Sequence, residues 1–135
     1  MPRASGTFEV KLSPLTLNNS AADSSLGRMD IDKQFLGDLA ATSRGEMLSA
    51  GTAVKGSAGY VALERVSGTL ENRAGSFVLQ HTGTMNRGEP RLEITVVPDS
   101  GTDQLKGLSG TMMITIVGGI HTYEFDYRLE QTDSI

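Results

Sequence analysis

The sequence contains no cysteine, and this absence excludes disulfide bonds, thiolate metal sites and cysteine nucleophiles. No segment approaches the run of about eighteen apolar residues that a membrane-spanning helix needs. The N-terminal residues also lack the apolar stretch of a secretory signal. We therefore expect a cytoplasmic protein without a membrane partner.

Basic residues are in the minority. The 12 Lys and Arg residues are outnumbered by 16 Asp and Glu residues, so the formal net charge is −4. This balance argues against a surface that follows the phosphates of DNA or RNA, and no nucleic-acid partner is expected. With 135 residues, 38% of them hydrophobic and only 4 of them proline, the chain has the size and composition of one globular domain, residues 1–135.

Apolar and polar residues alternate with a period of two along most of the chain, which is typical of β-strands. Residues Leu92–Val96 and Tyr123–Leu129 show this alternation clearly, and no segment has a convincing helical stripe. Residues 12–26 are predicted to form a long polar loop, and 101–110 is the best position for a helical turn. We predict eight strands, at about residues 5–11, 27–35, 39–50, 58–70, 76–85, 90–98, 111–117 and 120–130.

Six of the 16 glycines stand directly before a threonine. A glycine permits a bend or bulge in a strand, and the β-branched threonine after it resumes the extended conformation. The repeated pairs therefore favour a sheet that bends at its ends, as a small barrel requires.

Short loops fix the registers of neighbouring strands and can be tested against the hydrophobic pattern. A two-residue turn at Gly118–Gly119 places Ile114 opposite Tyr123 and Met112 opposite Phe125. One face of this hairpin is then apolar and the other is mostly polar.

Two further loops, at residues 86–89 and 72–75, share the strand at 76–85 and agree on which of its faces points inward. That agreement predicts an antiparallel up-and-down barrel of about eight strands, which leaves no exposed edge. A two-sheet β-sandwich is the alternative fold. The residues that both loops assign to the inner face are Phe77, Leu79 and His81.

Polar side chains also fall on the predicted inner face. The loop at 72–75 places His81 opposite Val66, so that Glu64 becomes a diagonal neighbour of His81 at roughly 7–8 Å between backbones. Three tyrosines and the second histidine share this face. The inward polar set is Tyr60, Glu64, His81, His121, Tyr123 and Tyr127.

Three blocks of the sequence, residues 59–70, 75–85 and 96–102, resemble blocks of a bacterial family of unknown function. The resemblance extends from Gly6 to Leu129. The fold of that family resembles the allene oxide cyclase barrel, so the resemblance implies a barrel of that kind but no particular reaction. The family usually has glycine at the position that Asp103 occupies in this sequence.

Glu64 and His81 are the leading candidates for a pair of residues with a chemical role. Burial raises the pKa of a carboxyl group and a neighbouring imidazolium lowers it, which is the mutual tuning that a general acid–base pair needs. The alternative is a structural pair whose members satisfy each other's hydrogen bonds. Adding His121 gives a set that suits a metal ion, but the pattern does not show that the three residues converge. We therefore predict no metal and no cofactor.

Three functions fit this interior. The first is binding of a small, mostly hydrophobic molecule by the inward polar set, with the tyrosine hydroxyls as donors to a ligand oxygen. The second is an isomerase or cyclase type of enzyme that uses Glu64 and His81 as acid and base in the same cavity. In the third, the lumen is packed and the protein acts through its outer surface.

Several outward residues are more apolar than a free surface needs, which predicts a homo-oligomer. They are Val61, Leu63, Val78, Val97 and Met113.

Overall fold

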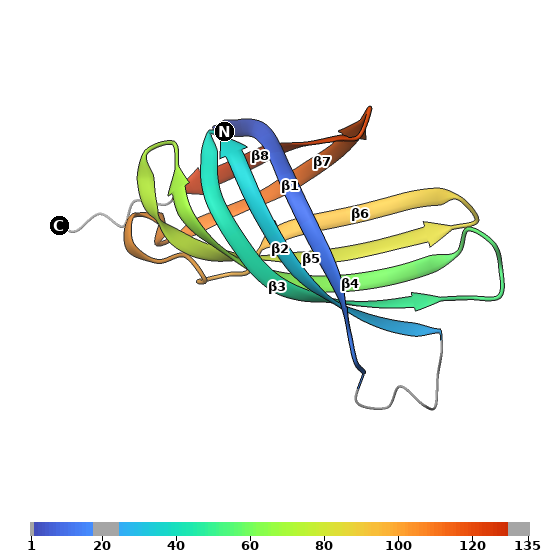
Figure 1. The fold of residues 1–135 in the computed structure, drawn as a ribbon. Coiled ribbons are helices and arrows are strands. Elements are labelled where there is room, and N and C mark those ends of the chain that lie inside the picture. The colour runs from blue at the N-terminus through green and yellow to red at the C-terminus, as the bar shows by residue number, and fades with distance from the viewer. Residues whose placement is uncertain (1, 18–24, 130–135) are drawn as a thin grey trace.

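The computed structural model describes residues 2–17 and 25–129, which form a closed barrel of eight antiparallel strands in chain order (Figure 1). The predicted all-β, up-and-down barrel is confirmed, and the β-sandwich does not form. The only helix in the described part of the chain is the 3₁₀ turn η1 (Asp103–Leu105), and it is too short to cross a membrane. The strands are β1 (Arg3–Leu15), β2 (Leu26–Gly37), β3 (Leu39–Gly51), β4 (Ala58–Leu70), β5 (Arg73–Asn86), β6 (Glu89–Val96), β7 (Leu108–Val117) and β8 (Ile120–Leu129).

The predicted loop at residues 12–26 is shorter than expected. β1 continues to Leu15, because residues 12–15 pair in register with residues 28–31 of β2. Residues 18–24 of that loop lie outside the described residues. The helical turn expected within 101–110 is present as η1, where Asp103 adopts a left-handed φ of 53°. That conformation favours glycine, in agreement with the residue that the resembling family usually has there.

Two of the three predicted hairpin registers are confirmed, and the third is wrong. The pairings of β7 with β8 and of β5 with β6 agree with the prediction. Between β4 and β5, however, His81 lies opposite Ala62 and not opposite Val66. The tight turn is Glu71–Asn72, with left-handed φ angles of 46° and 70°, rather than a loop at 72–75. The displacement along β4 is an even number of residues, so every side chain keeps its predicted face.

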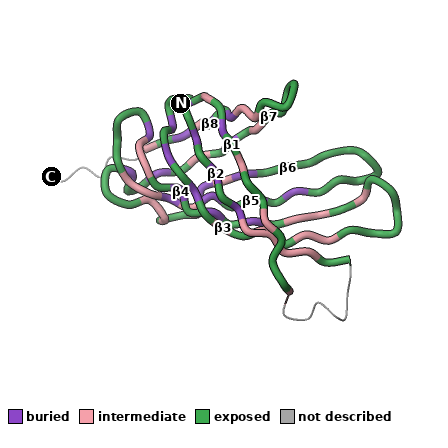
Figure 2. The backbone as a smooth tube through the Cα atoms, viewed as in Figure 1, coloured by how far each residue is buried: buried purple, intermediate pink, exposed green. Residues whose placement is uncertain are grey.

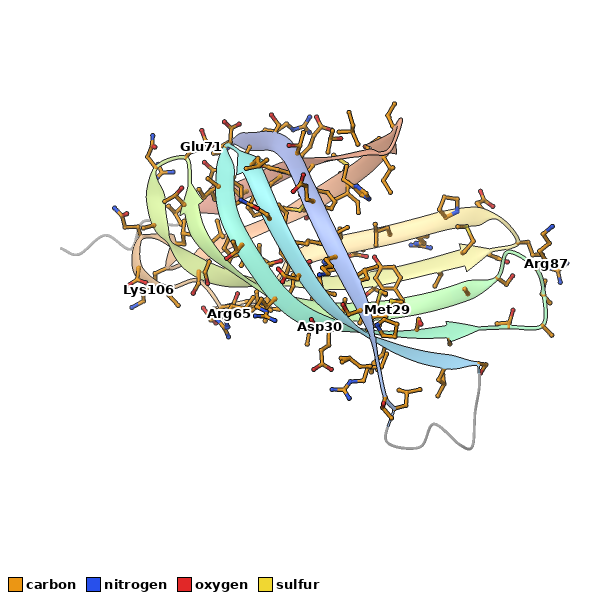
Figure 3. The ribbon with its side chains drawn as sticks, in the orientation of Figure 1. Met29, Asp30, Arg65, Glu71, Arg87 and Lys106 are labelled. Carbon is orange, nitrogen blue, oxygen red and sulfur yellow. The ribbon has the colours of Figure 1, made fainter. Side chains whose placement is uncertain are left out.

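The apolar core fills one end of the barrel, which we call the closed end (Figure 2). The β2–β3 and β4–β5 turns and η1 lie there, and η1 inserts the fully buried Leu105. Phe125 stacks between Phe77 and Tyr127, with ring centroids 5.8 and 5.5 Å apart. At the opposite end, which we call the mouth, the β3–β4 and β5–β6 hairpins project outward. Figure 3 labels Glu71 at the closed end and Arg87 at the tip of the β5–β6 hairpin.

The barrel is closed most weakly between β6 and β7. Only Ile94 with Met112 and Thr95 with Thr111 are paired across this seam. Towards the mouth the two strands diverge, and the β7–β8 hairpin points away from β6 (Figure 1). The barrel wall is therefore hydrogen-bonded across this seam only at these two pairs, and the pairing does not extend towards the mouth.

Candidate functional site

Four polar side chains lie buried inside the barrel, one on each of the neighbouring strands β2 to β5. Glu64 is at their centre. Its Oε2 accepts hydrogen bonds from Lys33 Nζ at 2.9 Å and from His81 Nε2 at 2.5 Å. Its Oε1 accepts a hydrogen bond from Ser43 Oγ at 2.6 Å. We call Lys33, Ser43, Glu64 and His81 the buried polar network.

The strand registers explain why these side chains meet. Lys33 and Ser43 are cross-strand partners, and Glu64 lies diagonally from His81 on the adjacent strand. β3 contributes only the small residues Ser43 and Gly45 between Lys33 and Glu64. The two long side chains can therefore approach each other across β3.

Charge compensation keeps the buried carboxyl group ionised. Burial by itself raises the pKa of Glu64, but the hydrogen bond from His81 and the positive charge of Lys33 outweigh it and lower that pKa to about 2. The ammonium of Lys33 also lies 5.0 Å from the centre of the Phe8 ring and 5.7 Å from that of Phe35, within range of cation–π attraction. Every buried side-chain nitrogen and oxygen in the described residues has a hydrogen-bond partner.

Tyr60 connects the buried polar network to the mouth. Its hydroxyl lies 3.5 Å from Nδ1 of His81, the ring nitrogen that does not contact Glu64. The Tyr60 ring lies against Gly83, where an added Cβ would stand 2.4 Å from Cε1 of the ring. Burial, and then the negative charge of Glu64, raise the pKa of Tyr60. The phenol therefore keeps its proton at neutral pH and can donate it in a hydrogen bond.

A hollow of about 530 Å³ opens at the mouth beside Tyr60. This volume lies within the range of about 300–1,000 Å³ that is typical of small-molecule sites. Its walls come from β3, β4, β5 and β6 and are mainly apolar. They include Met47, Ala58, Tyr60, Gly83, Met85 and Leu92.

The second histidine is not part of the buried polar network. His121 is half-buried at the start of β8, where its ring centroid lies 5.1 Å from that of its cross-strand partner Phe8. Phe8 in turn contacts the ammonium of Lys33. Across residues 2–17 and 25–129, no three His, Asp or Glu side chains are grouped so that they would hold a metal ion.

The two remaining tyrosines of the predicted inward set hold the closed end together. The Tyr123 hydroxyl contacts the carbonyl oxygens of Leu36 and Leu39 at 2.9 and 3.1 Å and accepts the N–H of Leu39 at 2.9 Å. Tyr127 donates a 2.5 Å hydrogen bond to Glu71. Burial is the main cause that raises the pKa of both phenols. Both hydroxyls therefore serve turns of the barrel and lie away from the hollow.

Two members of the buried polar network, Lys33 and Ser43, were missed by the sequence analysis. A signal was present for Lys33, which stands between Ile31 and Phe35 in a strand of period two and so shares their inner face. A lysine on an apolar strand face requires a buried partner.

Another hollow, of about 660 Å³, lies against the outer side of β2 to β4. It borders the exposed ion pair between Arg28 and Glu46 and includes Leu17, which adjoins residues outside the described part of the chain. None of the four residues of the buried polar network lines it, so the site is assigned to the mouth.

These observations define a class of protein: a small, closed, antiparallel β-barrel with a buried lysine–glutamate–histidine network beneath an apolar mouth. The chain belongs to the family described as "Protein of unknown function (DUF3224)", whose model matches residues 4–127. A crystal structure of a DUF3224 protein of unknown function from Shewanella oneidensis MR-1, at 1.84 Å resolution, is similar over 98% of this chain and 99% of that chain. The two share 53% sequence identity and superpose with a TM-score of 0.92.

No curated protein is significantly similar to the chain. The membership in a family of unknown function that the sequence blocks implied is thus confirmed, while the likeness to the allene oxide cyclase barrel stays a prediction.

Proposed function

We propose that the protein binds a small, mostly apolar molecule with a hydrogen-bond acceptor at one end, in the hollow at the mouth. The observation that carries this proposal is the apolar hollow of about 530 Å³ with the protonated phenol of Tyr60 in its wall. The core fills the closed end, which supports a ligand position at the mouth and not along the whole lumen.

The Tyr60 hydroxyl determines which kind of hydrogen-bond acceptor the ligand should carry. Its 3.5 Å separation from His81 Nδ1 is longer than a good O–H hydrogen bond of about 2.5–3.0 Å, so the hydroxyl can turn towards a ligand oxygen. Lys33 and Glu64 neutralise each other deeper in the barrel, so neither is a free charge that would attract an ionic ligand towards Tyr60. Among the described residues, the one charged residue in the lining of the hollow is Arg91, on β6, and the acceptor that we propose for the Tyr60 hydroxyl is a neutral carbonyl or ether oxygen.

Calorimetric titration with butyrophenone, an apolar ketone, tests the location of the site. Ala58→Trp fills the hollow and is expected to abolish binding. Ala40→Trp places the same bulk on an exposed outward position of β3, outside the lining of the hollow, and should bind like wild type. The proposal fails if wild type does not bind the ketone, or if Ala58→Trp binds it equally well.

The role of the Tyr60 hydroxyl is tested with a matched pair of ligands. Tyr60→Phe keeps the ring and removes the hydroxyl, so the affinity for butyrophenone should fall by about 3- to 10-fold, the value of one neutral hydrogen bond. The affinity for butylbenzene, which lacks the carbonyl oxygen, should not change. Equal losses for both ligands would assign Tyr60 a packing role only.

An acid–base enzyme is the second candidate, and the chain of contacts from Glu64 through His81 to Tyr60 favours it. In such a step, Tyr60 Oη takes a proton from the carbon next to the ligand carbonyl as its phenolic proton passes to His81 Nδ1, and the electron pair of the broken C–H bond moves to the carbonyl oxygen to form an enolate. Glu64 then stabilises the imidazolium. Proton NMR of butyrophenone in heavy water would show exchange of the hydrogens next to the carbonyl. Exchange that disappears in His81→Asn supports the enzyme, and binding without exchange supports the binding protein.

A further inference from the structure

The edge of β7 that faces away from β8 is unpaired near the mouth. Residues 113–117 pair with β8 on one side. On the other side, the pairing with β6 ends at Met112, and no other strand of the described residues takes its place. Figure 1 shows the β7–β8 hairpin diverging from β6 at this point.

The tight turn determines which backbone groups this edge presents. The residues on either side of a two-residue turn form a hydrogen-bonded pair, and such pairs alternate along the hairpin. Val117 and Thr115 therefore direct their N–H and C=O groups towards β8. Ile114 and Ile116 direct theirs away from it, towards the open edge. The hydrogen-bonding groups of this edge are thus symmetric about Thr115.

The side chains along this edge carry no charge. Residues 107–123 contain no Asp, Glu, Lys, Arg or Pro, although natural sheets usually protect their edges with such residues. Ile116 is 61% and Val117 is 69% exposed, and Met113 is also exposed. Figure 2 shows the tip of this hairpin as exposed. The opposing edge of β6, residues 89–93, has a different character, since it carries two glutamates, an arginine and a proline.

We propose that the β7 edge is where two copies of this chain pair, antiparallel and about a two-fold axis at Thr115. In this register Ile114 lies opposite the partner subunit's Ile116, and both residues present their free backbone groups. Met113 lies opposite the partner subunit's Val117 on the other face of the joined sheet. A two-fold interface requires a self-complementary surface, and this segment provides one.

A second copy suits this edge better than a charged strand does. Self-pairing brings identical residues together, so a charged edge would repel its own copy, whereas residues 113–117 have no charge to repel. Both alternating rows of side chains on the segment are largely apolar, so pairing buries apolar surface on each face of the sheet. Met113 belongs to the outward apolar residues from which the sequence predicts a homo-oligomer.

Disulfide cross-linking tests the register directly, because the chain has no cysteine of its own. At the axis, Thr115 and its copy form a non-hydrogen-bonded pair, whose Cβ atoms lie close together. Thr115→Cys should therefore form covalent dimers under mild oxidation at least about tenfold faster than a surface cysteine without a preferred partner. Thr82→Cys, on the exposed outer side of β5, is the matched control. Equal rates for the two variants would overturn the proposal, as would faster cross-linking by Ile116→Cys.

Sedimentation provides a second, independent measurement on unmodified protein. Wild type is expected to be a dimer. The Ile116→Lys variant is expected to be a monomer with an unchanged circular dichroism spectrum, because position 116 is exposed and the change should leave the fold intact. Leu63→Lys changes an exposed apolar residue on the outer wall of β4 and should remain a dimer. A monomeric wild type, or a dimer broken by Leu63→Lys and not by Ile116→Lys, would refute the pairing at β7.

Discussion

Lys33 Nζ and Glu64 Oε2 lie 2.9 Å apart although their strands, β2 and β4, are not neighbours in the sheet. The intervening strand β3 presents Ser43 and Gly45 at this level, and these small residues leave room for the two long side chains. Both partners are almost completely buried. The barrel therefore contains an ion pair whose members depend on each other, because either charge alone would be stranded in an apolar interior.

Removing only one charge of this ion pair should lower the free energy of unfolding considerably. Glu64→Gln leaves the Lys33 ammonium without a countercharge and is expected to lower the free energy of unfolding by about 3–5 kcal/mol. Combining it with Lys33→Met removes both charges and should recover much of that loss. Urea denaturation of the two single variants and the double variant measures the coupling. Arg28→Met breaks an exposed ion pair with Glu46 and should cost less than about 1 kcal/mol.

Acid should weaken the fold through Glu64. Its pKa is about 2 in the folded barrel and about 4.3 in an unfolded chain, so between these values the unfolded state binds more protons. The stabilisation from ionised Glu64, roughly 3 kcal/mol, is complete above about pH 5 and is lost as the pH falls towards 2. The test is to measure the free energy of unfolding between about pH 2 and pH 5, for wild type and for the Lys33→Met, Glu64→Gln double variant. Parallel pH profiles for the two proteins would contradict the prediction.

Gly83 is required by the position of the Tyr60 ring. Gly83→Ala places a Cβ 2.4 Å from Cε1 of that ring, so the ring must leave its position in the wall of the hollow. We expect a loss of about 1–3 kcal/mol in stability and weaker ligand binding. Gly59→Ala, whose new Cβ would be 3.6 Å from its nearest neighbour, is the control at the same end of the barrel. If Gly83→Ala is still as destabilising in a Tyr60→Ala background, the ring is not the cause.

The hydroxyls of Tyr123 and Tyr127 should contribute differently to the free energy of unfolding, although both are hydrogen-bonded. Tyr123→Phe leaves the backbone N–H of Leu39 without its partner in the core, which costs about 1–3 kcal/mol. Tyr127→Phe frees the carboxylate of the exposed Glu71, which water can solvate, so the cost should stay below about 1 kcal/mol. Thermal or urea unfolding compares the two variants, and a reversed order would show that the β2–β3 turn does not depend on Tyr123.

The alternation of residues predicted the inner face more reliably than the turns predicted the register. His81 lies opposite Ala62 and not Val66, yet Glu64 remains its diagonal neighbour, because it is two positions from either residue. The prediction that these two residues adjoin therefore survived a wrong register. The turn was misplaced because Glu71 occupies a left-handed position that its side chain does not signal.

The partners of Glu64 from β2 and β3 could not be predicted from the turns. Residues 52–57 join β3 to β4 without a short, diagnostic turn, so no register connected Ser43, or Lys33 on the strand beyond it, to Glu64. The hollow was equally inaccessible to sequence reasoning, because it depends on how far the hairpins at the mouth project. Tyr60, the residue that links the hollow to the network, was recognisable only as one of three inward tyrosines, and the other two lie at the closed end.

The pairing of β1 with β8 joins residues more than a hundred positions apart in the chain. Contacts of such long range form late, because the loop that they close costs the most entropy. During synthesis, β2 to β5 can already assemble as a curved sheet while β8 is still being made. The ion pair of Lys33 and Glu64 belongs to that early portion, whereas the ring stack of Phe125 must wait for the last strand. A ribosome that pauses before β8 would therefore hold an open sheet with its charged centre formed and its apolar end exposed to chaperones.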